Sequence, residues 1–407
     1  MTTPAIGTRN RRQESRIITA FNSLGTSIRN VSASHTLAAI QPLLGRYDIS
    51  GFADHSPKGA ETLKFIEVVR GNPRSGHLNL GKGFSFETAL ASGYMEAIEM
   101  STVEGPPEIA LHALPRSALL YTGGGKPPEP DDTGGGKPPE PDAAPMIRGV
   151  DLLSAEPVYS PVYEHFLSPA PSARSVSVNG LASGNTVEEA SLHCLYELIE
   201  RDLTAQSLRD PVLVQQLLLS DIPAPISNAL TELEAFGLHA EFYLLGQFLG
   251  VTVLQCALVK TGSGGEVYYG WGAHHFRTIA ISRAMTEAVQ AWCTREACRA
   301  QTLPLSRMPG GVMVSAEVLK LLREPVTRGE RQLRRRFIAC PSVAYSLTDQ
   351  DEQAPASPTA ALNHLLSSAR DAGIRHVFAW TLSPPDRPFA VVKCAVPGFE
   401  NPFEEDA

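Results

Sequence analysis

The sequence predicts an α+β fold, in which helices and strands are mixed along the chain. Short runs rich in β-branched and aromatic residues alternate with segments whose apolar residues recur at helical spacing. In addition, three of the helical segments share one pattern of acidic residues, which is the most informative internal similarity in the chain. Proline-rich stretches at 169–171 and 353–358 are followed at once by new helix or strand signals, so neither marks a convincing domain boundary.

Composition excludes several classes of protein. The chain has 407 residues, a net charge of −8 and 43% hydrophobic residues, which is typical of a globular protein with a large core. It lacks the basic stripe of a protein that binds nucleic acid non-specifically. The six cysteines form no CxxC pair, which argues against a zinc site or a disulfide framework. No apolar run long enough for a signal peptide or membrane span follows the arginine-containing N-terminus, and we expect a soluble, cytoplasmic protein.

The first helix is predicted at 34–46, from leucine and isoleucine residues at three- and four-residue spacing. Strands are predicted where β-branched and aromatic residues cluster, at 49–53, 63–70, 240–245, 251–260, 375–381 and 389–396.

The segment 122–142 contains the string TGGGKPPEPD twice. Glycine triplets oppose a fixed backbone and Pro-Pro-Glu-Pro favours polyproline II, so we expect a mobile surface insertion. Its GGGK is followed by Pro-Pro instead of a Ser or Thr that opens a helix, so this string is not interpreted as a phosphate-binding loop.

Three helices carry acidic residues at matched positions. Their segments begin at Ala89, Ala190 and Ala280, and a glutamate lies seven residues after each alanine. Because an α-helix has about 3.6 residues per turn, positions three apart lie on one face, and a glutamate pair at this spacing can direct two carboxylates at one point. The matched residues are Glu96 with Glu99, Glu197 with Glu200, and Glu287 with Gln290.

Carboxylates grouped in this way suit Mg²⁺, which binds a few carboxylates together with substrate phosphates. A solvated acidic face is the ordinary explanation of a single such pair. These helices, however, are rich in Ala, Leu, Ile and Met, which is typical of buried helices, and buried glutamates need a positive partner. Arg201 and Arg283 can pair with the acids or bind phosphate oxygens. The pattern indicates a site for a metal-bound polyphosphate.

Residues that precede two of these helices add to the predicted site. Asn185 or Thr186 can cap the second helix. Glu189 lies eight residues before Glu197, which returns it to nearly the same helix face. Lys82 lies between two glycines and places a cation before the first helix, although a simple turn explains this tripeptide equally well.

Histidines and cysteines near the helices form no evident catalytic group. We expect His274 and His275 to pack or to cap the third helix rather than to act in catalysis. Cys293 and Cys298 lie on nearly opposite helix faces, which argues against a metal pair. Cys194 is interpreted as a core residue. The catalytic residues are left unassigned.

The sequence resembles the YcaO family through three motifs in order, GKGFSFETALASGYMEAIE, NGLASGNTVEEASLHCLYELIERD and GWGAHHFRTIAISRAMTEAVQ. The resemblance covers 24–400 and implies one large interwoven YcaO domain with an ATP site that has no Walker loop. We then expect a polar N-terminal extension at 1–23, an insertion at 121–143 and an acidic tail at 401–407. The resemblance implies that ATP and Mg²⁺ activate a peptide-backbone amide, whose oxygen attacks the γ-phosphate.

The resemblance also implies roles for individual residues. Phosphoryl transfer depends mainly on positioning and charge neutralisation, which carboxylates with bound metal and arginines supply. The implied metal ligands are Glu96, Glu99, Glu189, Glu197 and Glu200. The implied ATP contacts are Asn185, Glu189, Arg201, Arg283 and Glu287, to which we add Lys82 from its position and, from a looser match, Arg29 and Thr36.

Within the family, the resemblance favours thioamide formation. The string VVKCAVPGFE resembles members that have a TfuA-like partner and are associated with thioamides, and the PxPxP tail common in azoline-forming cyclodehydratases is missing. Azoline formation on Cys, Ser or Thr is the alternative. A non-catalytic ATP-binding scaffold of a peptide-modifying complex is a second alternative, which the complete set of carboxylates disfavours.

The expected modification is post-translational and acts on a ribosomally made peptide or protein, as in RiPP and bacteriocin biosynthesis. The expected partner is a TfuA-like or leader-peptide-binding protein, without nucleic acid or membrane, and a homodimer is allowed.

Overall fold

The computed structural model describes residues 27–71, 78–115, 143–167, 177–262, 266–300, 340–347, 355 and 357–402. Helices and strands alternate through these residues, which confirms the predicted α+β fold. The predicted N-terminal extension, the glycine- and proline-rich repeats and most of the acidic tail lie outside the described residues. The described α-helices are α2 (Ala33–Ile40), α3 (Phe86–Glu104), α4 (Val187–Arg209), α5 (Ala224–Ala235), α6 (Arg277–Arg299) and α9 (Pro358–Asp371). Within this part of the chain, no helix has the length and apolar character needed to cross a membrane.

The described strands form three sheets. An antiparallel sheet consists of β1 (Ile49–Asp54), β2 (Lys64–Arg70) and β3 (Asn79–Gly83). A five-stranded sheet has the order β11 (Val267–His274), β10 (Val251–Lys260), β9 (Leu238–Phe248), β8 (Gln215–Ser220) and β12 (Ser342–Ser346). The third has the order β4 (Leu111–Pro115), β5 (Ala143–Asp151), β13 (Phe378–Thr381), β14 (Ala390–Ala395) and β7 (Leu181–Gly184), with β6 (Pro157–Pro161) also paired to β5.

Each acidic helix follows a short strand, so that β3 precedes α3, β7 precedes α4 and β11 precedes α6. Glycines let strand and helix approach closely. A Cβ at Gly81 would lie 1.9 Å from the carbonyl oxygen of Ala89, and a Cβ at Gly272 would lie 2.1 Å from that of Ala280. The internal similarity of the sequence therefore reflects a repeated unit in which a helix packs directly on the backbone of the strand before it.

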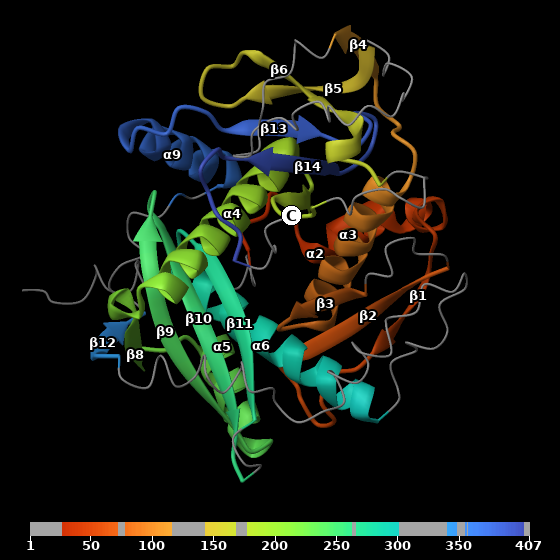
Figure 1. The fold of residues 1–407 in the computed structure, drawn as a ribbon. Coiled ribbons are helices and arrows are strands. Elements are labelled where there is room, and N and C mark those ends of the chain that lie inside the picture. The colour runs from red at the N-terminus through yellow and green to blue at the C-terminus, as the bar shows by residue number, and fades with distance from the viewer. Residues whose placement is uncertain are drawn as a thin grey trace, which may run out of the picture.

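Helix α4 connects the larger sheets. Figure 1 shows it crossing between the β13–β14 strands and the five-stranded sheet, while α3 lies beside the β1–β3 sheet. One apolar cluster includes Leu195 of α4, Val253 of β10 and Val392 of β14, each at most 1% exposed. Burying a side chain of this size contributes about 1.5–3 kcal/mol. This shared core fixes the position of α4 relative to both sheets.

Two local predictions need correction. The first helix ends at Ile40 and continues as a 3₁₀ helix over Gln41–Tyr47. Pro42 has no N–H to donate to the carbonyl group one turn earlier, so the α-helical pattern cannot continue through it. The Gly81-Lys82-Gly83 tripeptide belongs to strand β3 and is not a turn, because its glycines allow α3 to pack on the strand.

Candidate functional site

The carboxylates of α3 are partly buried. Glu99 accepts hydrogen bonds from the Ser183 amide at 2.7 Å and from the Ser183 hydroxyl at 2.6 Å, and burial raises its pKa to about 7. Glu96 lies one turn earlier and accepts a long hydrogen bond of 3.4 Å from the Leu80 amide. Burial and the neighbouring charge of Glu99 raise the pKa of Glu96 to about 8. A nearby cation would therefore stabilise the charged form of both carboxylates.

The α4 carboxylates have the same character. Burial raises the pKa of Glu197 and of Glu200 to about 7. The charge of Glu99 raises the first pKa further, and that of Glu287 raises the second. Arg201 opposes both shifts, and its Nε lies 4.0 Å from Glu197 Oε1.

Helix α6 completes the acidic group. Lys82 Nζ of β3 donates to Glu287 Oε2 at 3.1 Å, across 205 positions of sequence. Arg283, one turn before Glu287, lowers the pKa values of Glu197 and Glu200 through its charge. Its buried Nε has no hydrogen-bond partner among the described residues. The structure thus brings the acidic faces of α3, α4 and α6 together with Lys82, Arg201 and Arg283.

The N-terminal residues suggested by the looser match lie at the start of α4. Thr36 Oγ1 donates to Asn185 Oδ1 at 2.7 Å. Arg29 Nη1 lies 3.6 Å from Glu189 Oε2 and donates to the Ser183 carbonyl at 3.4 Å. Burial lowers the pKa of Arg29, and the Glu189 charge opposes this shift. The tertiary fold therefore joins these distant residues in one polar cluster.

Glu189 has both carboxylate oxygens engaged by protein. One accepts from the Asn30 amide, and the other accepts from the Asn185 amide and side chain, each at 2.8 Å. Thr186 caps α4 as predicted, because its hydroxyl accepts from the Glu189 amide at 3.2 Å. These contacts hold Glu189 beside Asn185, and its role as a metal ligand stays a prediction.

The donor set fits a magnesium–phosphate complex better than a metal held by protein alone. Among the described residues, no three Asp, Glu, His or Cys side chains are grouped closely enough to hold a metal ion. Mg²⁺ in phosphoryl-transfer sites is typically bound by one or two carboxylates and completes its shell with phosphate oxygens and water. Carboxylates with raised pKa values beside the Arg283 guanidinium fit such a shared shell.

Sequence reasoning missed two residues. Ser183, at the end of β7, holds Glu99 through its amide and hydroxyl. His193 lies four residues after Glu189 and four before Glu197, so it occupies the acidic face of α4. The i, i+4 spacing is visible in the sequence and could have identified His193, whereas nothing local distinguishes Ser183.

The histidines before α6 have the roles that the sequence predicts. His274 Nδ1 accepts from the Phe276 amide at 2.9 Å, which satisfies a donor at the start of the helix. His275 is packed, and its Nδ1 lies 2.7 Å from the Tyr196 hydroxyl. Cys194 is fully buried in the apolar core, as predicted.

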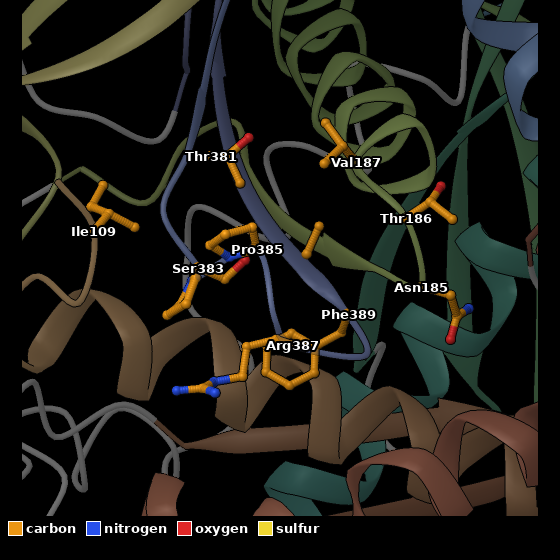
Figure 2. Close-up of a pocket in the computed structure, with 11 residues that line it drawn as sticks. Ile109, Asn185, Thr186, Val187, Thr381, Ser383, Pro385, Arg387 and Phe389 are labelled. Atoms are coloured by element: carbon orange, nitrogen blue, oxygen red, sulfur yellow. The ribbon is translucent and has the colours of Figure 1, made fainter.

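A cavity of about 480 Å³ adjoins the start of α4. Asn185, Thr186 and Val187 line one part of it, and Ser383 and Arg387 line another (Figure 2). The cavity therefore reaches Asn185, the residue shared by the Thr36 and Glu189 contacts.

Comparison with known proteins identifies relatives in bacteria. The chain is 26% identical over 293 residues to an uncharacterized Mycobacterium tuberculosis protein, covering 68% of this chain and 64% of that protein. The alignment thus spans less than two thirds of that relative. The chain is also 26% identical over 288 residues to an uncharacterized Rhizobium leguminosarum bv. trifolii protein encoded in the tfuA 3′ region. This match covers 65% of the chain and 67% of that protein.

The fold matches a solved structure of YcaO from Methanopyrus kandleri bound with AMPPCP and Mg²⁺, with a TM-score of 0.67 at 22% identity. The match covers 91% of this chain and 92% of that one. Residues 80–400 match the family described as YcaO cyclodehydratase, ATP- and Mg²⁺-binding, in agreement with the expected cofactors. The described fold thus matches a known arrangement, and the chain is a member of the YcaO family.

Proposed function

We propose that this protein uses ATP and Mg²⁺ to activate a peptide-backbone amide for post-translational modification. The observation that carries the proposal is the meeting of buried and partly buried carboxylates from α3, α4 and α6 beside Arg283. Raised pKa values of about 7 and 8 mean that these carboxylates are poorly stabilised by the protein itself. A cation complexed to phosphates would supply the missing charge.

The site residues would have different roles in binding Mg²⁺ and ATP. Glu96, Glu99, Glu197 and Glu200 are the candidate metal ligands. Arg201, Arg283 and Lys82 would bind phosphate oxygens, and Glu287 holds Lys82 in place. Asn185, Arg29 and Thr36 form the polar cluster for the rest of the nucleotide, and Glu189 positions Asn185.

The chemistry depends on placement. When bound, ATP supplies a phosphoryl group that converts the amide oxygen into a leaving group. An amide oxygen is a weak nucleophile, so holding it against the γ-phosphate has to provide much of the rate. Cations beside the phosphates would neutralise the charge that develops, and they would do so more effectively in a dry site than in water.

We infer thioamide formation as the specific outcome. An external sulfide then forms the C=S bond while the amide oxygen leaves as part of phosphate. The relative encoded in the tfuA 3′ region supports this choice, because the resemblance associates TfuA-like partners with thioamides. Azoline formation is the competing outcome, supported by the cyclodehydratase description of the family.

The proposal is tested by co-expressing the protein with peptides encoded beside its gene and a candidate TfuA-like partner, followed by mass spectrometry. A mass increase equal to replacement of oxygen by sulfur supports thioamidation, and loss of one water supports azoline formation. The Glu200→Gln variant serves as the control that should leave the peptide unmodified. Unchanged peptides in every combination would favour a non-catalytic scaffold and contradict the proposal.

A further inference from the structure

Two histidines beside the acidic site each have a buried ring nitrogen with no hydrogen-bond partner among the described residues, His193 Nδ1 and His274 Nε2. His274 is fully buried at the end of β11, whereas the His193 ring is partly exposed. Tyr196 lies one turn after His193 and packs on His274, with ring centroids 4.7 Å apart. The two histidines therefore lie near one another where α4 meets β11.

The tautomer of His274 follows from its contacts. The Phe276 amide donates to Nδ1, so this nitrogen carries a lone pair and no proton. The neutral ring must then carry its proton on Nε2. His274 thus presents a buried N–H donor without an acceptor, which is a costly arrangement unless a ligand uses it.

His193 provides the complementary group. Its buried Nδ1 has no hydrogen-bond partner among the described residues, and with the ring proton on Nε2 this nitrogen is a lone-pair acceptor. Burial and the charges of Arg29 and Arg283 keep the pKa values of both histidines well below the ordinary value, so both rings are neutral. Arg283 Nε is a third buried group without a partner among the described residues.

These three groups match a secondary amide. A carbonyl oxygen has two lone pairs and can accept from His274 Nε2 and Arg283 Nε, while the amide N–H can donate to His193 Nδ1. The oxygens of a fully ionised phosphate group can only accept hydrogen bonds, so such a group would meet the His193 lone pair unfavourably. We propose that His193 and His274, together with Arg283 Nε, bind the backbone amide of the peptide substrate beside the ATP site.

This inference rests on the proposed function, because it places the substrate amide next to the carboxylates and Arg283. It assigns substrate-binding roles to two histidines that packing and capping explain only in part. Capping uses His274 Nδ1, and amide binding would use the opposite nitrogen of the same ring.

A binding experiment tests the inference without turnover. Protein labelled with ¹⁵N-histidine is saturated with Mg²⁺ and AMPPCP and titrated with N-methylacetamide, N,N-dimethylacetamide or inorganic phosphate. We expect N-methylacetamide to shift the ring resonances of both histidines. The dimethylated amide has no N–H and should shift only His274, and inorganic phosphate should shift neither. Phosphate shifts without amide shifts, or no shift with either amide, would overturn the inference.

Variants separate ligand binding from capping. Asparagine at position 274 keeps an acceptor near the place of Nδ1 but has no group at Nε2, so His274→Asn should stay folded and bind N-methylacetamide about threefold to tenfold more weakly. His193→Leu should show a similar loss. His364→Ala is the matched control, because His364 is exposed and its Nδ1 lies 3.3 Å from His275 Nε2, on the side of that ring away from Tyr196. Equal amide affinity in all three variants would refute the assignment.

The same experiment distinguishes the inference from the proposed function. If Mg²⁺ and AMPPCP fail to bind, the proposed function is contradicted. The amide titration is then carried out without nucleotide, and the same histidine shifts decide whether the amide binds. If the nucleotide binds and the amide does not, only the inference fails.

Discussion

At the scale of single residues, the site concentrates acidic groups that stabilise the folded chain poorly on their own. Glu96 is the clearest case, because burial and the nearby Glu99 charge raise its pKa to about 8. Natural proteins often accept such a cost where function requires it. At position 96, ligand binding and the stability of the ligand-free fold therefore favour different residues.

We predict that Glu96→Gln stabilises the ligand-free protein while impairing ATP turnover. Glutamine keeps the shape but removes the cost of a poorly compensated carboxylate, so Tm should rise by about 2 °C or more. Thermal unfolding and phosphate release measure the two effects on the same preparations. A Tm that falls together with activity would show that the carboxylate is structural.

We predict that Glu200→Gln abolishes ATP turnover while the fold is retained. The substitution removes the charge of a carboxylate that feels both Glu287 and Arg201. Circular dichroism verifies the fold, and ATP hydrolysis is measured with excess Mg²⁺. Wild-type hydrolysis in this variant would exclude Glu200 from the site.

His165 lies away from the site and gives a pH prediction. Its ring packs on Trp380 at 4.8 Å, neither ring nitrogen has a hydrogen-bond partner among the described residues, and burial lowers its pKa to about 3. Below about pH 6.5 the unfolded chain binds a proton that the folded chain does not, so stability falls as pH decreases toward 3. Between pH 7.5 and 5.5, the free energy of unfolding should therefore fall by about 1 kcal/mol less in His165→Phe than in the wild type.

Urea unfolding of wild type and variant at both pH values measures this difference. An identical pH dependence in the two proteins would contradict the neutral, buried state of His165.

At the scale of elements, the site depends on how closely each acidic helix packs on its strand. A Cβ at Gly272 of β11 would meet the Ala280 oxygen at 2.1 Å and the Ala284 nitrogen at 2.7 Å, both backbone atoms. The helix would have to move, and Arg283 and Glu287 would move with it. The glycines of the repeated units therefore determine where the functional side chains lie.

We predict that Gly272→Ala destabilises the protein by about 1–3 kcal/mol and weakens Mg²⁺–AMPPCP binding, because α6 cannot keep its distance from β11. Gly45→Ala is the matched control, since a Cβ there has no heavy atom within 4 Å, and its effect should stay within about 0.5 kcal/mol. Chemical denaturation and calorimetric titration measure the two quantities. Equal stability of both variants would show that the strand and helix are not in tight contact.

At the scale of the whole molecule, the ligand should contribute to folding, because it balances charge contributed by three helices. We predict that Mg²⁺ and AMPPCP together raise Tm, with a stabilisation of about 2.7 kcal/mol when free nucleotide is 100 times its Kd. Mg²⁺ alone should have a smaller effect, since phosphate oxygens complete its shell. Differential scanning calorimetry with and without EDTA measures this linkage, and an unchanged Tm would contradict it.

Much of this organisation is readable in the sequence. The acidic helices, Thr186 as a cap and the strand at 251–260 are local features, set by spacing and residue preference within a few turns. The change from α to 3₁₀ helix at Pro42 is also local and could have been anticipated. The strand at Gly81-Lys82-Gly83 could not, because its glycines serve a helix packed against them.

The sequence by itself determined which helices carry paired carboxylates, because helical spacing places residues three apart on one face whatever the rest of the chain does. Only the tertiary structure decided what those carboxylates meet. Lys82 reaches Glu287 and Ser183 reaches Glu99 across many strands and helices. Glu189 is occupied by Asn30 and Asn185 rather than left open. Such pairings depend on how sheets and helices pack, and no local spacing encodes them.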